Sequence, residues 1–204
     1  MVKRLKTLGL TALLSALLPL CAAAEPLEEK IASIEAFSAE FTQVVKDSEG
    51  KTVSESSGTL ALKKPQSFML HTEGMDELYL YTRADGVYYF DPFVNQLTIL
   101  PLSALERTPF ALLITKDPKV WQNYEITEVQ KGRLYQIRPV EALAASADFV
   151  KLELSFSGSY LSSLAIYFKD GSFSTYDLKA QRFETAADAF ELKLPPDVET
   201  ADER

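Results

Sequence analysis

Short apolar runs separated by polar turns make up most of the chain beyond residue 40. Apolar and polar residues tend to alternate within these runs, which is typical of strands, whose side chains point to opposite faces in turn. Turn residues such as those from Asp47 to Gly50 and from Lys169 to Gly171 separate neighbouring runs. We therefore predict an antiparallel meander, either a sandwich or a barrel, with strands that include residues 78–82, 87–90, 97–100, 134–137, 149–156, 161–168 and 173–178.

The segment from Ser57 to Leu70 is predicted to form a strand, a break at Pro65 and a second strand. Alternation places one cation at the end of an apolar row on a single face: Leu60, Leu62 and Lys64, joined by Phe68 and Leu70 if the register continues past the proline. On alternation alone, a lysine that extends its ammonium group to water at a strand end is the simpler interpretation.

Two stretches have helical spacing instead. Leu27, Ile31 and Ile34 recur as on an amphipathic helix, and we expect extended chain from about Ala39. Residues 102–117 are also helical in pattern, and Pro109 should divide them into two short pieces. These helices are too apolar for a solvated surface, so we predict that they cover a curved antiparallel sheet. Residues 142–147 form either another helical turn or a loop.

The first 24 residues follow the pattern of a secretory signal peptide. A basic start with Lys3, Arg4 and Lys6 precedes the apolar run 8–20, and three alanines end at Ala24. We predict that residues 1–24 are cleaved and that residues 25–204 form a single domain. Cys21 is the one cysteine, and no small residue precedes it, so we expect neither a lipid anchor nor a disulfide.

The charge of the chain excludes some classes of partner. The chain has 21 basic and 29 acidic residues, a net charge of −8. Cleavage would remove the cations Lys3, Arg4 and Lys6 and no acid, which moves the net charge to −11. Such a protein has no electrostatic footprint for nucleic acid and should be repelled by anionic lipid surfaces. A site for lipid would therefore have to be apolar, although aromatic-rich strands and apolar helices are on composition alone more often an ordinary core.

Motifs for catalysis and for metal binding are absent from the sequence. His71 is the one histidine, and no nucleophile or acid can be placed beside it, so a surface or strand-edge histidine is the simpler interpretation. We expect no cofactor and no metal. Trp121 either lines a cavity or packs under the helices.

Several motifs together resemble the LolA family of periplasmic outer-membrane lipoprotein carriers. They are residues 41–43 (FTQ), 58–68 (GTLALKKPQSF), 85–96 (DGVYYFDPFVNQ), 108–113 (TPFALL), 121–124 (WQNY) and 194–198 (LPPDV). The resemblance is collinear over the mature chain and implies a mainly β fold, an unclosed antiparallel barrel with a helical lid over an apolar cavity. It also implies a periplasmic monomer that takes acylated lipoproteins from the inner-membrane transporter LolCDE and delivers them to the outer-membrane receptor LolB, without covalent chemistry.

The resemblance assigns roles to particular residues. LolA-like proteins use a basic residue, usually arginine, to hydrogen-bond the lid, and the matching position is Lys64, with Ile31 and Leu113 where the latch meets the lid. Leu70 stands where the family often has tryptophan. The acyl-chain cavity implied by the resemblance is lined by Phe41, Phe68, Leu70, Phe90, Phe93, Phe110 and Leu112.

Other classes remain open from the sequence. The same fold occurs in RseB-like envelope stress sensors, but those have an additional C-terminal domain. The receptor LolB is itself a lipoprotein, which the sequence around Cys21 disfavours. A periplasmic lipid hydrolase would need His71 as its base.

Overall fold

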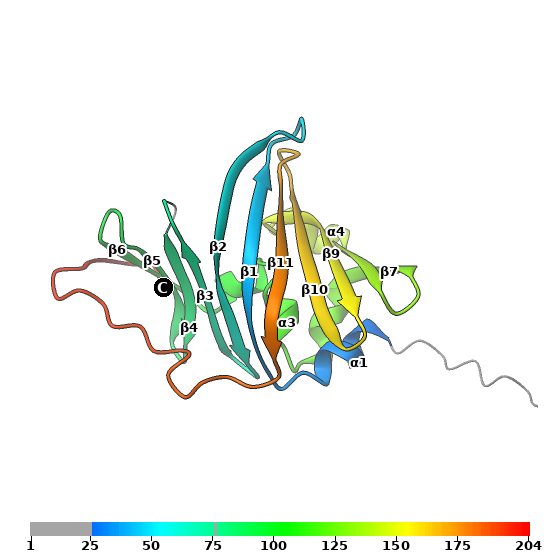
Figure 1. The fold of residues 1–204 in the computed structure, drawn as a ribbon, viewed down its shortest axis with the longest axis horizontal. Coiled ribbons are helices and arrows are strands. Elements are labelled where there is room, and N and C mark those ends of the chain that lie inside the picture. Colours follow the sequence, from blue (N-terminus) through cyan, green and yellow to red (C-terminus); the bar gives the residue numbers. More distant parts are fainter. Residues whose placement is uncertain (1–25, 76) are drawn as a thin grey trace, which may run out of the picture.

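The computed structural model describes residues 26–75 and 77–204, so the predicted signal peptide lies outside the described residues. Twelve strands form one sheet (Figure 1) in the order β12-β6-β5-β4-β3-β2-β1-β11-β10-β9-β8-β7. The strands are β1 Ala36–Lys46, β2 Thr52–Lys63, β3 Ser67–Glu73, β4 Leu78–Arg83, β5 Gly86–Asp91, β6 Gln96–Leu100, β7 Tyr124–Gln130, β8 Leu134–Pro139, β9 Phe149–Ser157, β10 Tyr160–Phe168, β11 Phe173–Arg182 and β12 Glu199–Asp202.

The sheet does not close on itself, because its terminal strands β7 and β12 each have a neighbour on one side only. All neighbouring strands are antiparallel except β12, which runs parallel to β6. The sequence pattern did not predict this strand and indicated antiparallel pairing throughout. After β11 the chain passes along the sheet to its far edge and reaches β6 in the parallel direction (Figure 1). The prediction of a mainly β, unclosed barrel with short helices is confirmed.

The helices are short and lie behind one face of the sheet in Figure 1. They are α1 Leu27–Ala32, α2 Ser103–Glu106, α3 Ala111–Ile114, the 3-10 helix η1 Pro118–Asn123, and α4 Glu141–Ala144. Pro109 separates α2 from α3, as predicted. Every residue of α3 is buried, which agrees with a helix that is apolar on all sides.

The first strand begins earlier than predicted. Helix α1 ends at Ala32 and β1 starts at Ala36, whereas the sequence pattern placed extended chain from about Ala39. The difference arises because Phe37 and Phe41 alternate with polar residues and are buried, and because β1 pairs with β2 from Ala36 onward.

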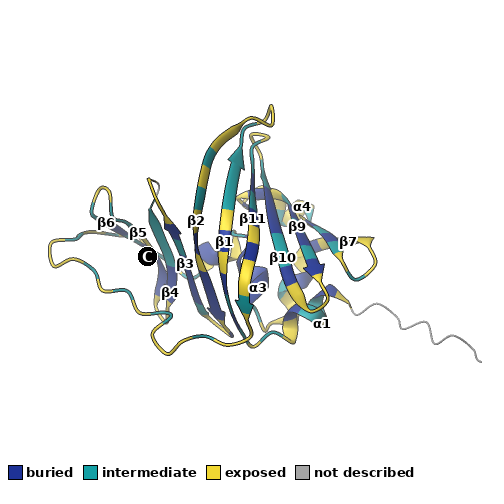
Figure 2. Ribbon diagram, in the orientation of Figure 1, coloured by how far each residue is buried: buried dark blue, intermediate teal, exposed yellow. Residues whose placement is uncertain are grey.

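The two faces of the sheet bury separate apolar clusters, and Figure 2 shows buried residues on the strands and the helices alike. The face toward the helices, here called the inner face, belongs to a large cluster. The opposite, outer face has a smaller cluster that is covered by the segment after β11 through residues such as Phe190 and Leu194. The strand alternation predicted for residues 57–70 holds, because Leu62 pairs with Phe68 and Leu60 with Leu70. Within the described residues, no helix is long and apolar enough to cross a membrane.

Candidate functional site

The candidate site is the interface between the inner face of the sheet and the helices. We call its residues the lid cluster. It takes buried side chains from α1, from the strands and from the segment that contains α2 and α3: Leu27, Ile31, Phe41, Leu60, Leu62, Phe68, Leu70, Leu105, Phe110, Leu112, Leu113 and Ile114, among others. Trp121 of η1 is also buried here, so it packs under the helices.

Aromatic rings join the sheet to the lid. Phe68 is fully buried, and its ring centroid lies 5.0 Å from that of Phe110. Phe110 in turn meets Tyr176 of β11 edge to face at 6.3 Å, and Tyr176 meets Phe41 of β1 at 5.3 Å. Offset and edge-to-face pairs at these distances are favourable beyond simple burial. The lid is therefore seated on the sheet by a continuous set of rings.

Lys64 lies at the edge of this cluster with only 7% of its surface exposed. Its Nζ donates a hydrogen bond to the main-chain carbonyl of Ile31 in α1 at 2.5 Å. Its main-chain N–H donates to the carbonyl of Glu35 at 2.9 Å. Burial lowers the pKa of Lys64 because the ammonium group loses hydration, and the carboxylate of Glu35 opposes part of that shift. The side chain thus joins the end of a strand to a helix of the lid.

Ile31 and Leu113, the two residues predicted to meet the latch, make different contacts. The carbonyl of Ile31 accepts the hydrogen bond from Lys64. Leu113 is buried in the same cluster through its side chain, and the hydrogen bond of Lys64 goes to α1 and not to α3. The geometry brings the three residues to one site, while their action as a latch stays a prediction.

An ion pair beside the latch was missed by sequence reasoning. Lys116, which follows α3, contacts Glu35 between α1 and β1 with an N–O distance of 2.7 Å. Both side chains are substantially exposed, at 48% and 68%, so the pair contributes little to stability. Nothing in the sequence could have paired these residues, because they are 81 positions apart and the fold alone brings them together.

Two of the seven residues assigned to the cavity lie elsewhere. Phe90 packs in the outer-face cluster with Tyr81 and Leu97. Val87, three residues earlier in β5, belongs to the lid cluster, so alternation sends Phe90 to the opposite face. Phe93 is 90% exposed in the turn between β5 and β6, so it does not line the cluster. The other five, Phe41, Phe68, Leu70, Phe110 and Leu112, are all buried in the lid cluster.

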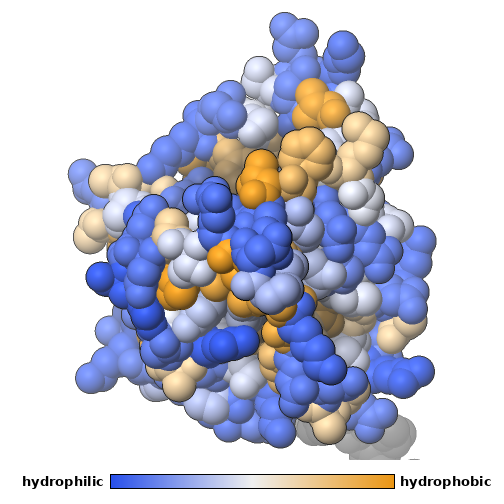
Figure 3. All heavy atoms as spheres, turned by 90° about the vertical axis from the view of Figure 1, so that its left-hand side faces the viewer, coloured by the Kyte–Doolittle hydropathy of each residue, from blue (hydrophilic) through white to orange (hydrophobic). Residues whose placement is uncertain are grey.

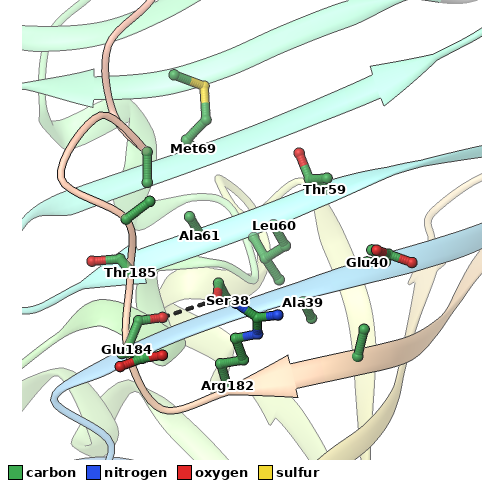
Figure 4. Close-up of a pocket in the computed structure, with 13 residues that line it drawn as sticks. Ser38, Ala39, Glu40, Thr59, Leu60, Ala61, Met69, Arg182, Glu184 and Thr185 are labelled. Atoms are coloured by element: carbon green, nitrogen blue, oxygen red, sulfur yellow. Dashed lines mark hydrogen bonds between the residues drawn. The ribbon is translucent and has the colours of Figure 1, made fainter.

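The surface of the protein also has shallow pockets. One of about 640 Å³ is on the outer face, where Figure 4 shows Ala61 and Met69 facing the segment around Glu184 and Thr185, with a hydrogen bond from Ser38 to the carbonyl of Glu184. Another, of about 510 Å³, is lined by Met75, Glu77, Leu78, Tyr89, Asp91 and Phe93. Figure 3, which views the β6 side of the molecule, shows hydrophobic residues in small groups between hydrophilic ones.

His71 does not join the lid cluster. Its Nε2 lies 3.1 Å from a carboxylate oxygen of Glu77, and its ring stacks on Tyr79 at 4.0 Å. Tyr79 packs against the outer-face cluster, which puts this histidine on the far side of the sheet from the lid. Among the described residues, no group of three or more histidine, cysteine, aspartate or glutamate side chains could hold a metal ion.

The protein is a half-barrel: its sheet is curved and unclosed, and a lid of short apolar helices covers the inner face. Within this class, the chain belongs to the family of the outer membrane lipoprotein carrier protein LolA, whose family model matches residues 32–193. The resemblance found in the motifs is thereby confirmed.

Individual relatives agree with this membership. The outer-membrane lipoprotein carrier protein of Pseudoalteromonas translucida is 30% identical over 184 residues, which are 88% of this chain and 86% of that protein. The protein of the same name from Aeromonas salmonicida is 32% identical over 188 residues, covering 89% and 90% of the two chains. An uncharacterized conserved protein from Thermus thermophilus shares the fold, with a TM-score of 0.50 over 86% of this chain and 96% of that one at 10% identity.

Proposed function

We propose that this protein carries acylated lipoproteins through the periplasm, from the inner-membrane transporter LolCDE to the outer-membrane receptor LolB. Membership of the LolA family and the names of its relatives support the proposal. The observation that carries it is an apolar cluster held between a sheet and short helices, with a buried lysine that joins the two. On this proposal the protein is a monomeric chaperone whose work is binding and release, without covalent chemistry.

The physical need for such a carrier is large. Each CH₂ group of an acyl chain that leaves a membrane for water costs about 0.8 kcal/mol. A lipoprotein with several acyl chains therefore cannot cross an aqueous compartment unless those chains are shielded. An apolar site on a protein supplies the shield, and an acidic surface keeps the carrier itself from adhering to anionic lipid.

The lid cluster can take up acyl chains by exchange. In the described structure the space on the inner face is filled by the protein's own side chains, such as Phe110, Leu112 and Leu113. If the helices move aside, acyl chains replace these side chains against the sheet. One apolar contact is then exchanged for another, so the net free-energy change is small and the cargo can be released again.

Lys64 gives this exchange a direction. Its hydrogen bond to Ile31 stabilises the lid-down state, which holds no cargo. Cargo must then bind with enough free energy to displace the lid, and reclosure of the lid favours release at the receptor. The hydrogen bond from Lys64 to Ile31 suits this role because it is buried. The ion pair between Glu35 and Lys116 is exposed and contributes little.

Charged substitutions at the aromatic contact test the proposal. Phe68→Glu and Phe110→Glu should each abolish lipoprotein release from spheroplasts, because a carboxylate in this cluster opposes acyl-chain burial. Phe93→Glu is the matched control, since Phe93 is 90% exposed, and it should release lipoproteins like the wild type. Thermal unfolding of each purified variant establishes that it is folded before release is compared. Wild-type release by both Phe68→Glu and Phe110→Glu would contradict the site.

The alternative functions have less support. A role as an RseB-like stress sensor is not favoured, because the relatives described above are named as lipoprotein carriers. A histidine-based hydrolase is not favoured either, since His71 lies on the outer side of the sheet, hydrogen-bonded to Glu77 and stacked on Tyr79.

A further inference from the structure

Three polar residues form one row across the inner face of the sheet. Gln43 of β1 is directly opposite Ser56 of β2 on one side and Tyr176 of β11 on the other. The hydroxyl of Ser56 donates to Oε1 of Gln43 at 3.1 Å, and Nε2 of Gln43 donates to the hydroxyl oxygen of Tyr176 at 2.9 Å. The three side chains are therefore linked by hydrogen bonds across three neighbouring strands.

The direction of these hydrogen bonds leaves one donor at the end of the row. Oε1 of Gln43 accepts from Ser56, and the amide NH₂ group of Gln43 points toward Tyr176 and donates to its oxygen. The hydroxyl oxygen of Tyr176 therefore accepts a hydrogen bond from Gln43. Among the described residues, none accepts a hydrogen bond from this hydroxyl group. Burial raises the pKa of Tyr176 to about 12, so the phenol keeps that proton at physiological pH.

The row lies at the border of the lid cluster. One step along the strands toward the helices, Phe41 is opposite both Gly58 and Leu178, and Tyr176 itself touches Phe41 and Phe110 edge to face. One step the other way, Val45 is opposite Ser54, and the hairpin between β1 and β2 extends beyond the level of the helices (Figure 1). Tyr176 thus has its ring in the apolar cluster and its hydroxyl on the polar row.

We propose that the Tyr176 hydroxyl, oriented by Gln43 and Ser56, donates a hydrogen bond to an ester carbonyl at the head of a bound acyl chain. This inference rests on the proposed function. An acyl chain that fills the lid cluster ends in a carbonyl, which accepts hydrogen bonds and donates none. A donor at the apolar border matches that end of the ligand. Tyr176 would therefore distinguish acyl esters from alkyl chains of the same length and set how deeply they enter.

Two lipopeptides that differ only in this carbonyl test the assignment. One has a cysteine with an S-linked dipalmitoylglyceryl group, and the other has the corresponding dihexadecylglyceryl ether. Tyr176→Phe should weaken binding of the ester probe about 3- to 10-fold, as expected for one hydrogen bond, and change binding of the ether probe less than twofold. Tyr81→Phe, at a fully buried tyrosine of the outer-face cluster, is the control and should alter neither affinity.

A second variant keeps the tyrosine and removes its free donor. Gln43→Glu puts a carboxylate beside the phenol, and this carboxylate accepts the hydrogen bond that the Tyr176 hydroxyl would otherwise donate to the ligand. Binding of the ester probe should again be weakened relative to the ether probe. Equal weakening of both probes by Tyr176→Phe, or no weakening of either, would overturn the carbonyl assignment alone. If the wild-type protein binds neither probe, the proposed carrier function fails as well.

Discussion

Lys64 places an ammonium group among apolar side chains at the end of β2. Burial disfavours the charged form and lowers the pKa of this lysine, and the hydrogen bond to the Ile31 carbonyl offsets part of that cost. The net stabilisation of the closed lid is therefore modest, which suits a contact that must break when cargo arrives. Arginine at this position would offer five donors in a planar fork where lysine offers three on a flexible stem.

Lys64→Leu should give a carrier that binds lipoprotein and transfers it poorly. Without the hydrogen bond to Ile31 the lid-down state loses on the order of 1–3 kcal/mol, so transfer to LolB should fall about tenfold or more while uptake persists. Lys64→Arg should instead favour the closed state. Transfer is measured as the fraction of lipoprotein that reaches outer membranes containing LolB. Normal transfer by Lys64→Leu would contradict the latch role and leave Lys64 as a lysine at the end of a strand without a function in transfer.

Tyr176 should make the fold sensitive to alkaline pH. Its pKa is about 12 in the folded protein and about 10 in an unfolded chain, so the unfolded chain loses this proton first as the pH rises. The raised pKa stabilises the folded state by about 2–3 kcal/mol below pH 10, and this stabilisation is lost as the pH rises from 10 to 12. Urea unfolding across this range should show a shallower decline for Tyr176→Phe than for the wild type, and parallel declines would contradict the assignment.

At the scale of elements, the two faces of the sheet use different kinds of cover. The inner face is covered by short helices that Pro109 divides and that contact the sheet through side chains such as Phe110. The outer face is covered by an extended segment that ends as β12, hydrogen-bonded to β6. Main-chain pairing fixes the outer cover, whereas the inner cover depends on side-chain packing and the bond from Lys64. This difference is consistent with a lid that moves and an outer segment that stays in place.

Phe190→Ala should destabilise the protein without impairing lipoprotein release. Phe190 packs on the outer-face cluster, partly buried, so its truncation should lower the free energy of unfolding by about 1–3 kcal/mol. Phe183→Ala is a control in the same segment, because Phe183 is 46% exposed and stacks on Tyr160 at the surface; it should cost less. Equal costs in urea unfolding, or a loss of release with Phe190→Ala, would show that the outer segment is not a passive cover.

The whole molecule separates its apolar site from an acidic exterior. The sequence has 29 acidic and 21 basic residues, and the largest apolar surfaces of the described residues are packed in two clusters on opposite faces of one sheet. Association with a membrane through charge is therefore unfavourable. On the proposed function, delivery to a membrane would therefore depend on a protein partner.

The charge leads to a prediction for lipid surfaces. The protein without residues 1–24 should not sediment with phosphatidylglycerol vesicles, and its binding should be no greater than to phosphatidylcholine vesicles at low salt. Raising the salt concentration should not reduce binding, because no electrostatic attraction is present to be screened. Salt-sensitive binding to the anionic vesicles would contradict this expectation and point to a basic patch.

Much of the fold and part of the site could be predicted from residue patterns. Alternation along β2 and β3 correctly put Leu60, Leu62 and Lys64 on one face with Phe68, and Pro109 correctly marked the break between α2 and α3. The assignment of Phe90 to the cavity was wrong because the sequence does not show which face of a strand packs against the helices. Phe90 follows the same alternation, yet the pattern could not say which side of β5 met the helices, because both sides are apolar.

The sequence by itself determined most of the strands, the apolar helices, the acidic charge and the family, since these depend on local periodicity, composition and short motifs. Only the tertiary structure decided that β12 adds to the sheet beside β6, that Lys64 reaches Ile31, and that Ser56, Gln43 and Tyr176 form one row. These contacts join residues far apart along the chain. They depend on strand order and register, which are set by how the whole sheet packs and not by any single segment.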